Sequence, residues 1–74
     1  MTQLPVVSGE DTVRVLEKFG WRLARRARGS HIILVKPGSI YSLSVPDHKE
    51  IAKGTLRKIL RMANLSVEEF TQSL

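Results

Sequence analysis

The spacing of apolar residues changes twice along this chain, and that change limits the folds it can adopt. In residues 12–19 and 55–63 apolar side chains recur every three or four positions, which predicts two amphipathic helices. Between these helices the pattern becomes alternating or rich in β-branched residues, which is typical of strands. The expected strands are residues 21–27, 31–36 and 40–45. The predicted order is therefore α-β-β-β-α, with a short C-terminal helix beginning near residue 66.

Capping residues mark the ends of the helices. Ser8 is expected to cap the first helix, and Gly20 is expected to end it in a left-handed conformation. Asn64 is expected to cap the C-terminal end of the second helix. Residues 47–54 are expected to form a polar connection between the last strand and this helix. Ser66 and Glu69 have the spacing of a capping box and predict the start of the last helix.

An α+β architecture with two layers accommodates this order. A three-stranded antiparallel sheet would carry both main helices on one face, leaving the other face open. Residues 32–35 are apolar throughout and predict the central strand, whereas Tyr41, Leu43 and Val45 are expected to point into the core. Double-stranded-RNA-binding domains have the same element order, which is an analogy of fold alone.

The chain has 74 residues and no cysteine, and these two facts bound its size class and its setting. This length predicts a single domain, residues 1–74, with one modest core. The absence of cysteine removes disulfides and suits a reducing compartment, so a cytoplasmic location is expected. No apolar run approaches the roughly 20 residues that cross a bilayer, so no membrane association is expected.

Basic residues are concentrated in two segments. Residues 22–36 contain five basic side chains and no acid, and residues 49–61 contain five more against Glu50, within a net charge of +5. Such segments favour a polyanionic partner such as RNA, although two ordinary solvated faces would have the same composition. The candidate RNA-binding residues are Arg25, Arg26, Arg28, Lys53, Arg57 and Lys58.

His31 is the candidate catalytic residue, because it follows the Gly29-Ser30 turn in the most basic part of the chain. An imidazole can accept and donate protons near neutral pH, and RNA supplies its own nucleophile, the 2′-hydroxyl. His48 is a possible second acid or base. A structural role for either histidine stays open, and Gly29 and Ser30 are interpreted as supporting turn residues.

Other chemistries lack the residues they need. Hydrolytic magnesium sites require clustered carboxylates, and Asp47 and Glu50 are the only acids in the middle of the chain. No glycine-rich phosphate loop is present, so neither a metal nor a nucleotide cofactor is expected. Trp21 and Tyr41 could stack on bases, but the core needs most of the few aromatic residues.

Several short motifs follow one another along almost the whole chain: Leu4-Pro5, Ser8-Gly9, Phe19-Gly20-Trp21, Arg28-Gly29-Ser30-His31, Val45-Pro46-Asp47-His48, Gly54-Thr55-Leu56-Arg57-Lys58-Ile59-Leu60 and Leu65-Ser66-Val67-Glu68-Glu69-Phe70. Taken together, these motifs resemble the HicA toxins, the mRNA interferases of toxin–antitoxin pairs. The resemblance implies a double-stranded-RNA-binding-like fold, cleavage of mRNA and a HicB-type antitoxin as partner. His31 matches the catalytic histidine of that family. Ile32 departs from it, because the family often has a polar or aromatic residue there.

Two further functions are compatible with the same residues. The chain could be a catalytically silent RNA-binding module in which His31 only forms a hydrogen bond to a 2′-hydroxyl. It could also be a protein-interaction domain whose basic surface serves an acidic partner. The sequence does not separate the first of these from a ribonuclease.

Overall fold

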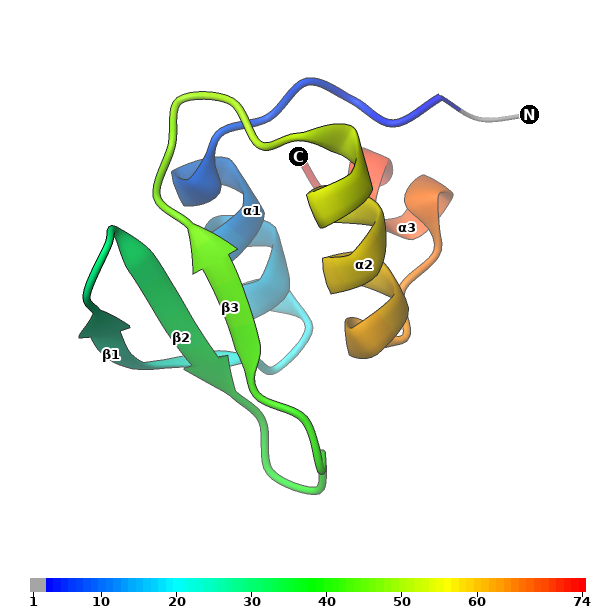
Figure 1. Ribbon diagram of the computed structural model, residues 1–74. Helices are drawn as coiled ribbons and strands as arrows, with labels where there is room; N and C mark the ends of the chain where they lie inside the picture. Colours follow the sequence, from blue (N-terminus) through cyan, green and yellow to red (C-terminus); the bar gives the residue numbers. More distant parts are fainter. Residues whose placement is uncertain (1–2) are drawn as a thin grey trace.

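The secondary structure follows the predicted order along the chain. The computed structural model describes residues 3–74, so the first two residues of the predicted domain 1–74 lie outside the described residues. The elements are α1 Gly9–Lys18, β1 Arg22–Ala27, β2 His31–Val35, β3 Leu43–Pro46, α2 Lys53–Ala63 and α3 Val67–Gln72 (Figure 1). The predicted α-β-β-β-α order with a short C-terminal helix is confirmed.

The first helix is fixed at both ends by the predicted residues. The Ser8 hydroxyl accepts the backbone N–H of Asp11 at 3.0 Å, and the Asp11 carboxylate accepts the backbone N–H of Ser8. Gly20 follows the helix with a φ of +96°, a conformation that glycine adopts without strain. The fully buried stripe of α1 consists of Thr12, Val15 and Leu16, whereas Val13 and Phe19 pack at its margin.

The three strands form one antiparallel sheet in the order β1-β2-β3, so β2 is central as predicted. Both main helices lie on the same side of this sheet (Figure 1). Apolar side chains of α1, β2, β3, α2 and α3 build the core between the two layers, and flanking loop residues complete it. Strand β1 contributes no buried side chain to it. Its largest fully buried members are Phe70, Leu16, Leu34, Leu43 and Leu56.

The two faces of the sheet differ in what covers them. Ile32 and Leu34 of β2 are buried and pair with Val45 and Leu43 of β3, which are also buried. Side chains alternate along a strand, so His31, Ile33 and Val35 point to the opposite face. That face carries no helix, and Val35 is accordingly 39% exposed. His31 therefore belongs to the open face of the sheet.

The start of β3 and the position of Tyr41 differ from the prediction. The strand begins at Leu43, and Tyr41 is 51% exposed, so the expectation that it enters the core is wrong. The cause is Ser39, whose hydroxyl accepts the Tyr41 N–H at 3.1 Å and donates to the Tyr41 carbonyl at 3.2 Å. A side chain that occupies both backbone groups of a residue takes them away from the sheet ladder.

The second helix begins two residues earlier than predicted, at Lys53, and the connection before it is not wholly polar. Ile51 in that connection is 3% exposed, and its backbone N–H donates to the carbonyl of Val7 at 2.9 Å. Asn64 ends α2 with a φ of +60°, as predicted. Ser66 and Glu69 form the predicted capping box, and α3 buries Phe70 completely.

Candidate functional site

His31 is the first residue of the central strand, and it is held from both sides. It pairs with Ala27 of β1 and with Pro46 of β3, and it is partly buried on the open face. The three residues before it, 28–30, form the turn of the hairpin. The neighbouring strands hold the backbone of His31 in place, and its face of the sheet is uncovered. The imidazole therefore extends from a fixed point of the backbone and has access to solvent.

The turn before His31 has an unusual backbone. Gly29 and Ser30 both have positive φ, at 75° and 62°. Glycine adopts this conformation freely, whereas for Ser30 it costs about 1 kcal/mol. The Ser30 carbonyl accepts the backbone N–H of Asp47 at 2.7 Å. This hydrogen bond supports the strained residue directly beside His31.

The loop that carries His48 lies at the same end of the molecule as this turn. His48 is exposed, and its carbonyl accepts the backbone N–H of Gly9 at 2.9 Å. Through the Asp47 N–H the same loop contacts the hairpin turn at Ser30. Figure 1 shows this loop passing the first turn of α1 on its way from β3 to α2. The structure thus brings together the two chain segments that carry the candidate histidines.

The sheet separates two arginines that are adjacent in the sequence. Arg25 pairs with Ile33, and since paired residues point to the same face, it shares the open face with His31. Arg26 pairs with the buried Ile32 and so points to the side of the helices. Of these two candidate RNA-binding residues, only Arg25 lies on the face of His31.

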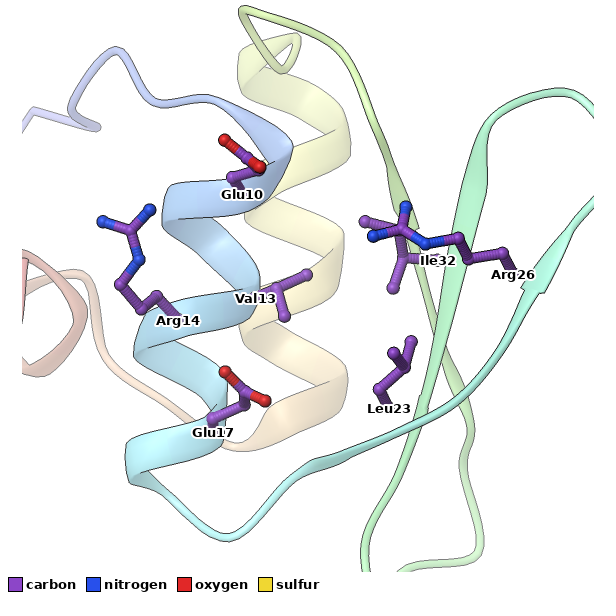
Figure 2. A pocket seen from close by; sticks show the side chains of 7 residues that line it. All are labelled: Glu10, Val13, Arg14, Glu17, Leu23, Arg26 and Ile32. Carbon is purple, nitrogen blue, oxygen red and sulfur yellow. The ribbon is translucent and has the colours of Figure 1, made fainter.

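Arg26 instead borders a groove between β1 and α1. Figure 2 shows Leu23 and Arg26 reaching from β1 toward this groove, with Val13, Glu10 and Glu17 of α1 on its other side. The Arg26 guanidinium lies 3.2 Å from a carboxylate oxygen of Asp47. The groove has acidic and basic side chains on its walls, which does not suit a polyanion.

The remaining basic candidates lie at the hairpin turn and on α2. Arg28 is exposed in the turn that precedes His31, and Lys53 is the exposed first residue of α2. Arg57 and Lys58 are exposed one turn further along and face different neighbours. Arg57 lies beside α3, near Leu65 and Val67, whereas Lys58 lies beside β3, near Ser42 and Ser44. Among them, Arg28 is the one in the turn directly before His31.

Three further observations bear on the alternatives raised by the sequence. Trp21 is 3% exposed and belongs to the core, as its expected core role requires. Over residues 3–74, no three histidine, cysteine, aspartate or glutamate side chains gather in a way that could hold a metal ion. Among the helices described for that same stretch, none is long and apolar enough to span a membrane.

Two residues near the site were not predicted from the sequence to act there. Asp47 contacts both the turn at Ser30 and the side chain of Arg26, and Gly9 contacts the loop of His48. Asp47 is a lone acid between two basic segments, and a glycine in the first turn of a helix is an unfavourable choice. Both features were signals that a tertiary contact requires these residues.

The geometry describes a small α+β domain with an uncovered sheet face, a histidine at the start of its central strand and basic residues around that end. The family model of the HicA toxin of bacterial toxin–antitoxin systems matches residues 9–65, which span α1 through α2. The chain therefore belongs to the HicA toxin family, and membership implies a cognate antitoxin as partner. A search of curated proteins returned no match.

Proposed function

We propose that this chain is the toxin of a toxin–antitoxin pair and an endoribonuclease that cleaves mRNA without a metal ion, with His31 as its catalytic residue. The observation that carries the proposal is the position of His31. Its backbone is fixed by pairing to both neighbouring strands, while its side chain belongs to the open sheet face beside Arg25. Membership of the HicA toxin family supports the same activity.

The proposed reaction uses the RNA's own nucleophile. His31 takes the proton from a 2′-hydroxyl, whose oxygen attacks the adjacent phosphorus, and the bond from phosphorus to the 5′-oxygen breaks. The leaving oxygen then receives a proton, from His31 or from His48 as the complementary acid. The products are a 2′,3′-cyclic phosphate and a 5′-hydroxyl. Arg25 and Arg28 would offset the negative charge that develops on the phosphoryl oxygens.

Binding of the RNA backbone is assigned to the basic side chains around this end. Arg25 is exposed on the face of His31, Arg28 is exposed in the turn before it, and Lys53 is exposed at the start of α2, which suits contacts to successive phosphates. Arg57 and Lys58 would extend this surface along α2. Arg26 is expected to contribute less, because Asp47 already offsets its charge.

The partner and setting follow from the same proposal. A HicB-type antitoxin is expected to neutralise the toxin, and mRNA cleavage places its action in the cytoplasm. The alternative function is a silent RNA-binding module, in which His31 contacts a 2′-hydroxyl without transferring its proton. The two functions differ in one measurable property, the cleavage of bound RNA.

The test compares purified wild type with His31→Ala on a long RNA, using His48→Ala as a matched histidine variant. We expect His31→Ala to abolish cleavage and growth inhibition while its circular dichroism spectrum and RNA affinity stay close to wild type. His48→Ala is expected to retain at least part of the activity. Undiminished cleavage by His31→Ala would refute the catalytic assignment, and a wild type that binds RNA without cleaving it would favour the binding module.

A further inference from the structure

We propose that Asp47 is a positioning residue for His31, and that Arg26 acts through Asp47 rather than by binding RNA. This inference rests on the proposed ribonuclease function. The ion pair between Arg26 and Asp47 connects β1 to the end of β3 across the start of β2, where His31 lies.

Asp47 contacts the hairpin of His31 in two ways. Its backbone N–H donates to the Ser30 carbonyl at 2.7 Å, and its carboxylate accepts from the Arg26 guanidinium at 3.2 Å. Arg26 lies in β1 just before the hairpin turn, and Ser30 is the last residue of that turn, next to His31. Asp47 therefore restrains both strands at the point where His31 begins β2.

The loop of Asp47 is itself fixed from the opposite side. The Gly9 N–H donates to the His48 carbonyl, and a Cβ on Gly9 would lie only 2.2 Å from the Pro46 carbonyl oxygen. The first turn of α1 thus packs directly against the backbone of residues 46–48. A loop held by a helix can restrain a turn, whereas a free loop would move with it.

The ion pair between Arg26 and Asp47 is expected to contribute little to the free energy of unfolding. The Arg26 and Asp47 side chains are 63% and 38% exposed, and ion pairs at such exposure contribute little to stability. An acid that follows Pro46, the residue paired with His31, also opposes the binding of a polyanion. A carboxylate in this place is explained if it orients the turn, because small displacements of a catalytic group lower the rate strongly.

The variant Asp47→Asn should change the cleavage rate and the RNA affinity in different ways. The variant keeps the size of the side chain and the backbone N–H, and it removes only the negative charge that pairs with Arg26. A residue that bound RNA would lose affinity when altered, whereas removing an acid should leave RNA affinity unchanged or raise it. The expected result is a slower reaction on a substrate that binds equally well.

The experiment measures single-turnover cleavage of a defined RNA by wild type, Asp47→Asn, Arg26→Gln and Arg26→Lys. The control is Arg14→Gln, which removes another exposed ion pair, between Arg14 and Asp11 at 3.8 Å. RNA affinity is measured in a His31→Ala background, with and without Asp47→Asn, so that cleavage does not interfere.

We expect Asp47→Asn and Arg26→Gln each to lower the maximal rate about tenfold, with Arg14→Gln unchanged and Arg26→Lys retaining most of the rate. The double variant should be no slower than either single one, because both remove the same contact. Melting temperatures should match wild type.

Two outcomes would overturn the proposal while leaving the ribonuclease function intact. The first is a wild-type cleavage rate for Asp47→Asn while His31→Ala has no activity. The second is a double variant, Asp47→Asn with Arg26→Gln, whose loss of rate is the sum of the two single losses. If the wild type cleaves no RNA, the ribonuclease function fails instead, and the NMR signals of the His31 imidazole decide the positioning. Asp47→Asn is expected to shift or broaden the His31 imidazole signals, whereas Arg14→Gln is not. Unchanged signals in Asp47→Asn would refute the positioning role of Asp47.

Discussion

Replacing Gly9 by alanine should destabilise the protein although alanine is the better helix former. Gly9 is the first residue of α1, it is buried, and an added Cβ would meet the Pro46 carbonyl oxygen at 2.2 Å and the Asp47 Cα at 3.0 Å. Ordinary contacts begin near 3.4 Å, so α1 and the loop must separate by about 1 Å. Both obstacles are backbone atoms, which cannot rotate away.

The magnitude follows from three contributions. Overpacking of this kind costs about 1–3 kcal/mol, and weakening the 2.9 Å hydrogen bond from Gly9 to His48 costs about 1 kcal/mol more. The gain in helix propensity is at most about 1 kcal/mol, and it is smaller at a helix end. The net loss is about 1–4 kcal/mol. For a domain of this size that lowers Tm by roughly 5–30 °C.

The chain supplies a matched control for this variant in Gly54. Gly54 lies in the first turn of α2, and an added Cβ there meets no atom within 4 Å. Gly54→Ala should therefore stabilise the protein by about 0.5–1 kcal/mol. Thermal and urea unfolding, followed by circular dichroism, measure both variants. A Gly9→Ala protein as stable as wild type would refute the close packing of α1 against the loop.

The remaining predictions concern the helix ends, the last helix and the RNA contacts. Asn64→Ala should cost about 1 kcal/mol in urea unfolding because of its φ of +60°, while Asn64→Gly should be close to neutral, and equal losses would contradict this cause. Phe70→Ala should cost about 3–5 kcal/mol in the same assay, since Phe70 is fully buried, and a loss below 1 kcal/mol would mean that α3 is not docked. In salt titrations, Arg25→Gln and Lys53→Gln should each reduce the slope of log RNA affinity against log salt concentration by about 0.7–0.9. Arg61→Gln, at the other end of α2, should leave this slope unchanged. Equal slopes for all three variants would assign these charges to an ordinary solvated face.

Much of the fold could be predicted because local signals and the global packing agree. The capping residues Ser8, Asn64 and Ser66 act where the sequence indicates, and the helical stripes supply the core. Tyr41 was misplaced because the alternating pattern of residues 40–45 says nothing of the Ser39 hydroxyl that holds its backbone. A side-chain hydrogen bond of this kind overrides strand propensity locally.

The candidate site was predictable in its residues and less so in its arrangement. Residues 28–31 indicate the turn and its histidine, but the register of β1 shifts between Leu23 and Arg25. That irregularity resets the alternation of side chains, so Arg25 points to the open face and Arg26 to the helices. The contacts of Gly9 and Asp47 join segments far apart in the chain. Such long-range contacts leave no periodic pattern in the sequence.

The nature of the cleaved RNA ends tests the central claim most directly, because it reports which atom attacked the phosphorus. Purified protein is incubated with a defined RNA in excess EDTA, and the fragments are identified by mass spectrometry. We predict cleavage that persists in the chelator and yields 2′,3′-cyclic phosphate and 5′-hydroxyl ends, with no such fragments from His31→Ala. Cleavage that requires added magnesium, or that leaves 3′-hydroxyl and 5′-phosphate ends, would contradict a reaction in which His31 activates the 2′-hydroxyl.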